Sequence, residues 1–329
     1  MAYSIGQIEA LTRRFYDPRT NDLVLDQDVV FKKLYNSGGV NISGGEKILE
    51  TIRTKKSAGG TVKDGQTVAI NMQQDHSAAT FDLKRHYAVA AIGRTEQLKN
   101  AGVFAVKRLM DSKWAFAAMD IADDLANDIF ATGASANGDG SDGVNSLDTV
   151  CQDGSATITG VSTMLGGIDK TAESAWAGNV TNWAGAAASG KAWSDFNSWF
   201  LSVADGNIIP NMVLMGPSVY GVYTNAGFNQ QRLVDRSNAD LGFLGASLNQ
   251  TPVFMDLHIT DGSATATDNR AYLLNTKFLF LRTHTAENMK RSPWVEPVDQ
   301  IGDMVTKISW AGELTTNDCS RQSALYNFT

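Results

Sequence analysis

The most regular hydrophobic pattern in the chain covers residues 95–131. Apolar side chains recur there at steps of three and four, which places them along one face of an α-helix. They are Val103, Val106, Met110, Trp114, Ala117, Ile121, Leu125 and Ile129. Thr95 can cap the N-terminus and Gly133 can end the helix, while residues 100–102 can interrupt its first turns. The pattern predicts a helix about 55 Å long on which other elements are laid.

A second pattern, over residues 46–92, is typical of strands. Its central part, "RTKKSAGGTVKDGQ", is polar and rich in glycine. Beyond it, positions alternate between two faces: Phe81, Leu83, Arg85, Tyr87 and Val89 against Asp82, Lys84 and His86. We predict a long two-stranded ribbon with a mobile tip. An isolated ribbon is marginal in water, so this one needs a neighbour to lie on.

The remaining segments are shorter and of mixed type. Residues 1–45 hold small apolar clusters without a period and predict an extended arm. Residues 191–204 predict an amphipathic helix with Trp193, Phe196, Phe200 and Val203 on one side, and Pro217 opens another helix. Short strands are predicted at "NMVLMGP" and "TPVFMD", and strands again dominate from residue 270 onward. The chain is therefore predicted to be α+β.

The composition is that of a folded protein, and the net charge bears on whether the chain binds nucleic acid. The chain has 329 residues, of which 43% are hydrophobic and 19% charged, which is ordinary globular usage. Its net charge of −7 and pI near 5.1 argue against gripping nucleic acid by neutralising phosphates. Enclosing nucleic acid behind a weakly acidic wall is compatible with this charge.

Cysteine usage and targeting signals are equally plain. Cys151 and Cys319 are far apart in sequence, so no disulfide framework or CxxC metal site is indicated. We interpret both as free thiols in a reducing cytoplasm. The first twenty residues lack the apolar core of a signal peptide, and no apolar run is long enough to cross a bilayer.

Residues 132–148, "TGASANGDGSDGVNSLD", pose the question of a calcium site. An EF-hand loop needs Gly at its sixth position and a bidentate Glu at its twelfth. Placing Gly140 or Gly143 sixth supplies no such Glu. A weak ion shared by Asp139, Asp142 and Asp148 stays open as an alternative. A solvated turn at the end of the long helix is the preferred interpretation.

Other candidate chemistry is weak. "NISGGEK" resembles half of a phosphate loop, but Ile48 follows Lys47 where Ser or Thr is needed, so we interpret it as a turn. The four histidines show no metal-ligand spacing, and no GxSxG motif occurs. We therefore predict no enzyme activity, no cofactor and no metal site, while a catalytic site assembled only in space stays open.

The ribbon carries the remaining candidate residues. Lys55, Lys56, Lys63 and Asp64 are either solvated surface or contacts to a neighbouring subunit. A single surface ion pair contributes little free energy. Repeated around a large assembly, such pairs can fix the register of its subunits.

The order of arm, ribbon, long helix, α/β block and terminal strands resembles the tailed-phage major capsid proteins of the Hong Kong 97 fold. Several stretches resemble one branch of that family and span most of residues 46–329. They are "TEQLKNAGVFAVKRLMDSKWAFAAMDIADDLANDIFATG", "GDGSDGVNSLD", "PNMVLMGPSVYGVYTN", "TPVFMD", "YLLNTKFLFLRTHTAENM" and "PVDQIGDMVTKISWAGELTTNDCSRQ".

The resemblance implies a division of the chain into five parts. They are an N-terminal arm (1–45), an extended ribbon or E-loop (46–93), a peripheral domain with a spine helix (94–149), an axial domain (150–265) and a return to the peripheral domain (266–329). The extreme C-terminus would rejoin the axial domain.

The resemblance also implies a function. Hexamers and pentamers of the chain would form an icosahedral shell around packaged double-stranded DNA, contacted non-specifically. Partners would be further copies of the chain, a separate scaffolding protein, a portal and a decoration protein, with no membrane. The shell would assemble in the host bacterial cytoplasm and become part of the virion. The alternatives are an encapsulin-type compartment of the same fold, and a hydrolase or binding protein with a site in the tryptophan-rich α/β block.

Overall fold

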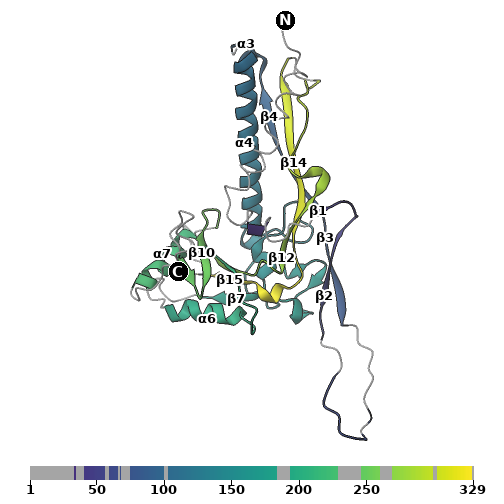
Figure 1. The fold of residues 1–329 in the computed structure, drawn as a ribbon, viewed down its shortest axis with the longest axis vertical. Coiled ribbons are helices and arrows are strands. Elements are labelled where there is room, and N and C mark those ends of the chain that lie inside the picture. Colours follow the sequence, from purple (N-terminus) through teal and green to yellow (C-terminus); the bar gives the residue numbers. More distant parts are fainter. Residues whose placement is uncertain are drawn as a thin grey trace.

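The computed structural model describes most of the chain beyond the arm. The described residues are 33–34, 41–55, 59–65, 67, 75–99, 103–183, 193–228, 246–259, 269–298 and 302–327. Most of the predicted arm thus lies outside them. The fold is a mixture of helices and strands. A tall part holds a long helix beside long strands, a broader part holds a second sheet, and a ribbon projects away from both (Figure 1).

The long helix is present as two segments, α3 (Arg94–Lys99) and α4 (Val103–Ile129). The 27 residues of α4 correspond to a length of about 40 Å. The predicted apolar stripe is buried wherever its side chains are described: Met110, Trp114, Ala117, Ile121, Leu125 and Ile129. The predicted cap is wrong, because α3 begins before Thr95. The backbone N–H of Arg94 instead donates to the Asp303 carboxylate at 2.8 Å.

A five-stranded sheet lies beside α4 and is centred on β14 (Met304–Thr316). Along one edge, β4 (Lys84–Ile92) pairs with it antiparallel. Along the other edge, β12 (Leu279–His284) and the short β13 (Lys290–Arg291) pair with it, also antiparallel. β1 (Asn41–Ile42) extends the sheet parallel to β12. This sheet therefore brings β1, from the first part of the chain, next to β12 and β14, from its last part.

A six-stranded sheet forms the second part, in the order β7-β15-β11-β8-β10-β9. Its strands are β7 (Asn179–Asn182), β15 (Ser323–Tyr326), β11 (Ala271–Leu274), β8 (Met212–Met215), β10 (Thr251–Met255) and β9 (Ala246–Leu248). α6 (Trp193–Val203) and α7 (Pro217–Phe228) cover one face, and α7 begins at Pro217 as predicted. Residues of the other face, including Leu214 and Tyr272, share a core with α4.

The remaining elements are short and connect these parts. They are β2 (Ile48–Arg53), β3 (His76–Phe81), β5 (Met164–Leu165), β6 (Ile168–Asp169), α5 (Leu147–Cys151) and the 3-10 turns η1 (Gly133–Ser135), η2 (Ser174–Trp176), η4 (Thr285–Glu287) and η5 (Cys319–Arg321). β2 pairs only with β3, and β5 only with β6, among the described strands.

The predicted strand across residues 81–90 is wrong in its continuity. β3 ends at Phe81 and β4 starts at Lys84, where the chain leaves the ribbon and joins β14. The paired ribbon is therefore β2–β3 alone. Phe81 is 1% exposed while Tyr87, predicted for the same face, is 68% exposed. The break reverses which residues of β4 face the protein interior.

His86, predicted on a polar strand face, is largely covered. Its side chain is 15% exposed, its Nε2 lies 3.2 Å from Asp128 Oδ2, and its ring lies 5.9 Å from that of Trp310. The reason is α4, which packs over this side of β4. The smaller residues Ala88 and Ala90 on the same side allow the helix to approach closely.

Candidate assembly interface

The ribbon is built from two six-residue strands that alternate cleanly between two faces. β2 and β3 pair from Ile48–Phe81 at the inner end to Arg53–His76 at the outer end. Glu50 and Ile52 face inward and are buried, whereas Leu49 is 67% exposed. Figure 1 shows the ribbon projecting away from both sheets. It presents a surface that no other described element covers.

The inner end of the ribbon is held by a largely buried charge cluster. Glu50 Oε1 lies 2.6 Å from Nη2 of Arg282 and 2.8 Å from its Nε. The hydroxyl of Thr315 donates to the same oxygen at 3.0 Å. Removing one member of such a buried pair leaves an uncompensated charge and is costly. Glu50 therefore anchors β2 to β12 and β14.

The β3 side of the ribbon is held by a glycine turn between β5 and β6. The backbone N–H of Thr80 donates to the carbonyl of Gly166 at 2.9 Å. Gly166 has a φ of +65°, and a Cβ there would lie 2.7 Å from that of Ala79. Only glycine fits this position without strain. Asp139 holds this turn in place, because its carboxylate accepts from the backbone N–H groups of Gly166 and Gly167 at 2.9 and 2.6 Å.

Residues 132–148 form a junction that connects the end of α4 with the ribbon and the six-stranded sheet. Their carboxylates bind different elements and do not converge on one point. Asp139 holds the glycine turn. Asp148 is fully buried and accepts from Tyr272 at 2.8 Å and from Arg270 at 3.2 Å. Asp142 stays exposed. Across the described residues, no three His, Cys, Asp or Glu side chains lie close enough together to hold a metal ion. This arrangement favours the interpretation as a turn.

The same junction contains a buried acid on β14. Glu313 is 1% exposed, and its Oε1 accepts from the N–H groups of Asn145 and Leu314 at 2.7 and 2.9 Å. Burial outweighs these hydrogen bonds and raises the pKa of Glu313 to about 8. Close by, Lys170 is fully buried, and its ammonium donates to the carbonyls of Thr149, Val150 and Gln152. Burial lowers the pKa of Lys170.

Both cysteines are free, as predicted, and both are buried in this region. Burial raises the pKa of each thiol, to about 11 for Cys319. A thiol with a raised pKa and no access to solvent is a poor nucleophile. The cysteines therefore belong to the core.

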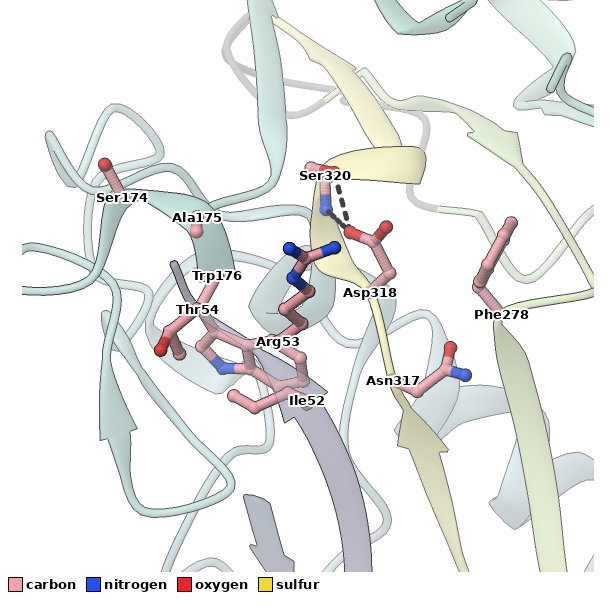
Figure 2. Close-up of a pocket in the computed structure, with 10 residues that line it drawn as sticks. All are labelled: Ile52, Arg53, Thr54, Ser174, Ala175, Trp176, Phe278, Asn317, Asp318 and Ser320. Atoms are coloured by element: carbon pink, nitrogen blue, oxygen red, sulfur yellow. Dashed lines mark hydrogen bonds between the residues drawn. The ribbon is translucent and has the colours of Figure 1, made fainter. Parts of the chain in front are cut away.

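A cleft of about 430 Å³ opens where the ribbon meets the body. Figure 2 shows Arg53 reaching from the ribbon into this cleft, with Asp318 and Ser320 on the opposite side and Trp176 below. Asp318 accepts from both the N–H and the hydroxyl of Ser320. The cleft thus marks where the anchored end of the ribbon stops and its projecting part begins.

A second uncovered surface lies on the five-stranded sheet, on the face turned away from α4. Tyr87 and Val89 of β4 are 68% and 53% exposed, and Val295, which bridges to Val305 of β14, is 58% exposed. Lys307 lies beside Val89 in the register. We call Tyr87, Val89, Val295 and Lys307 the bare face. Adjacent exposed apolar side chains of this kind mark interaction surfaces.

The predicted contact residues lie on the projecting part of the ribbon. Lys55, Lys63 and Asp64 are exposed, and Lys56 lies outside the described residues. No acidic group of a second subunit is present to test their role, so it stays a prediction. The sequence did not predict Glu50 and Arg282 as the residues that anchor the ribbon. Their only signal in the sequence is a Glu at an inward position of an alternating strand.

Comparison with known proteins gives no match from sequence. No protein-family model matches the chain, and no curated protein does. Solved structures do match. The cyanophage A-1(L) capsid has a TM-score of 0.59 at 16% identity, covering 91% of this chain and 93% of that one. The capsid of a native GTA particle has a TM-score of 0.58 at 12% identity, covering 88% and 87%. This protein has the capsid fold.

The capsid fold is shared by more than one kind of shell. The holo-SrpI encapsulin complex from Synechococcus elongatus has a TM-score of 0.50 at 8% identity, covering 88% of this chain and 84% of that one. These identities are low, so the likeness concerns the fold. These neighbours are structural shell proteins.

The surfaces described above now have a natural setting. Within the described residues, the ribbon and the bare face are two surfaces on which apolar side chains are left exposed. Within the described part of the chain, no helix combines the length and apolarity that a membrane crossing needs.

Proposed function

We propose that this protein is the major capsid protein of a tailed phage. Its copies would assemble as hexamers and pentamers into an icosahedral shell that encloses double-stranded DNA. The observation that carries this proposal is the ribbon. Its inner end is fixed by Glu50 and Arg282. Lys55, Lys63 and Asp64 of its outer part are exposed, and among the described strands β2 and β3 pair only with each other. An element anchored at one end and uncovered at the other is suited to lie across a neighbouring subunit.

The five-part division serves as the working description of the subunit. The ribbon, predicted over residues 46–93 but paired only as β2–β3, would be the E-loop. The five-stranded sheet, which includes β4, would form the peripheral domain together with α4. The six-stranded sheet would be the axial domain. Its pairing of β15 with β11 supports the prediction that the C-terminus rejoins that domain.

The acidic outer side of α4 supports a container that does not grip its DNA. Asp120, Asp123 and Asp124 are exposed there, and the chain carries a net charge of −7. Contact with DNA would be weak and non-specific. A scaffolding protein and a portal would be the further partners for this function, and a decoration protein would be an additional one. The protein would assemble in the bacterial cytoplasm and remain in the virion.

Electron microscopy of the purified full chain, expressed with and without the scaffolding protein, tests this function. We expect closed shells or hexameric and pentameric capsomers. A chain that stays monomeric under all these conditions would contradict any shell function. An encapsulin-type compartment, which the likeness to the SrpI shell supports, is separated by the contents: a co-purifying enzyme cargo favours it over a phage shell. Turnover of a small substrate by monomers would favour the hydrolase alternative.

A further inference from the structure

His258 lies where the six-stranded sheet meets the long helix, and both of its ring nitrogens face carboxylates. It follows β10 in the chain. Its Nε2 lies 2.9 Å from Asp123 Oδ1 on α4, and its Nδ1 lies 3.1 Å from Asp256 Oδ1. The exposed fractions of the side chains are 30% for His258, 64% for Asp123 and 10% for Asp256.

The two carboxylates are already committed as acceptors. Asp256 Oδ1 accepts the backbone N–H of His258 at 2.9 Å. Oδ2 of Asp123 accepts from the side-chain amide of Asn127, one turn further along α4, at 3.3 Å. Both oxygens that face the imidazole are therefore oriented to receive a proton donor.

Counting protons decides which form of the imidazole fits. A neutral ring donates from one nitrogen and carries a lone pair on the other, which would then face a carboxylate oxygen at hydrogen-bond distance. An imidazolium donates from both nitrogens. We propose that His258 is a proton-dependent clasp, which joins the six-stranded sheet to the long helix when protonated and loosens when it loses its proton.

The surroundings of the clasp are consistent with a positive charge. Asp120 and Asp124 are exposed on α4 on either side of Asp123. On the sheet side, Arg270 is directed to Asp148 at 3.2 Å. Asp261 and Asp268, further along the same connection, lie outside the described residues. Asp123 and Asp256, which lie within hydrogen-bond distance of the ring, are both acidic.

Loss of the clasp would affect only the residues next to His258. Ile259, the next residue, is 1% exposed and packs in the core shared with α4. The clasp therefore closes the outer side of a connection whose inner side stays packed. Losing it should free residues 256–258 and the adjoining turn of α4 without separating the two parts.

Hydrogen exchange of the full-length subunit tests the clasp independently of shell assembly. We expect the amides near residue 258 to lose about tenfold in protection between about pH 6 and pH 8, after correction for intrinsic rates, because one charge-assisted hydrogen bond is lost. His258→Gln should show low protection at both pH values. Asp123→Asn, at an exposed position that cannot unfold the core, should remove the same pH dependence.

His76→Gln is the matched control, because His76 also lies beside one carboxylate, Asp75 at 2.7 Å, but on the ribbon. It should keep the wild-type pH dependence near residue 258. Equal protection of the wild type at both pH values would overturn the clasp. So would a pH dependence that persists in both His258→Gln and Asp123→Asn.

Discussion

The two large sheets of this protein differ in how completely one chain covers them. The six-stranded sheet is enclosed by α6 and α7 on one face and by the core shared with α4 on the other, so that β8 and β11 are buried at every position. The five-stranded sheet has α4 on one face, and its other face is covered only along part of β14, where Glu313 and Thr315 are buried. Its other face leaves Tyr87, Val89 and Val295 more than half exposed.

Under the proposed function, this difference would separate what one chain needs to fold from what it leaves for contacts with other copies. Covering the bare face would gain about 25 cal/mol for each Å² of apolar surface removed from water. The part of the ribbon beyond its anchor, where Lys55, Lys63 and Asp64 are exposed, is the second such surface. Both sheets contribute to the core. Under the proposed function, the bare face of the five-stranded sheet and the ribbon would be available for assembly. Four predictions test this division, from the largest effect to the smallest.

Deleting residues 57–65 removes the outer part of the ribbon and should abolish shell formation. The deleted residues lie beyond the anchor at Glu50, so the isolated subunit should keep its unfolding temperature. Electron microscopy and thermal unfolding measured on the same preparation check both halves. Normal shells of normal stability would show that the ribbon is not an intersubunit element.

Glu313→Gln should stabilise the subunit at alkaline pH. The folded pKa of Glu313, about 8, lies above its ordinary 4.5, so the folded state favours the neutral acid. Its contribution is complete below pH 4.5 and is lost as pH rises to about 8, by about 1.4 kcal/mol per pH unit. The variant should lose this slope in denaturant unfolding measured across that range. Glu46→Gln, at an exposed site, should retain it.

Arg282→Met should destabilise the subunit by about 3 kcal/mol, because it leaves the buried carboxylate of Glu50 without its charge partner. The double variant Glu50→Gln/Arg282→Met should recover much of that loss. Urea unfolding of the single and double variants gives the coupling between them. Equal destabilisation by both would show that packing, rather than the uncompensated charge, is responsible.

A matched pair of valines compares the two sheets directly. Val253 on β10 is 5% exposed and Val89 on β4 is 53% exposed. Val253→Ala should lower the free energy of unfolding by about 2 kcal/mol. Val89→Ala should change it by less than about 1 kcal/mol in the isolated subunit but should lower the thermal stability of the assembled shell. If both variants lowered the free energy of unfolding of the isolated subunit by similar amounts, the two sheets would not differ in how well the chain covers them.

The elements with local patterns were predictable. The stripe from Met110 to Ile129 gave α4, because helix contacts join residues three and four apart. The same reasoning gave α6 and the start of α7 at Pro217. The ribbon was predicted in kind but not in extent. β4 was assigned to it because alternation is the same whether a strand pairs with β3 or with β14.

The anchor shows why the site itself escaped prediction. In "ILETIR", hydrophobicity suggests that Leu49 is buried and Glu50 exposed, and the structure has the reverse. Glu50 can be buried only because Arg282 and Thr315, far along the chain, meet it there. A buried charge is decided by its partner, and the partner is brought by the fold.

The sequence by itself determined the long helix, the acidic charge, the alternation of the ribbon and the likeness to capsid proteins in the order of elements. Only the tertiary structure decided that β4 joins β14, that Ala88 and Ala90 rather than Tyr87 and Val89 face α4, and that Asp139 and Asp148 hold a junction. The physical reason is the separation in sequence of the residues that interact. Helices and turns follow from neighbours in sequence, whereas strand pairing, buried charges and uncovered faces depend on contacts between residues distant in the chain.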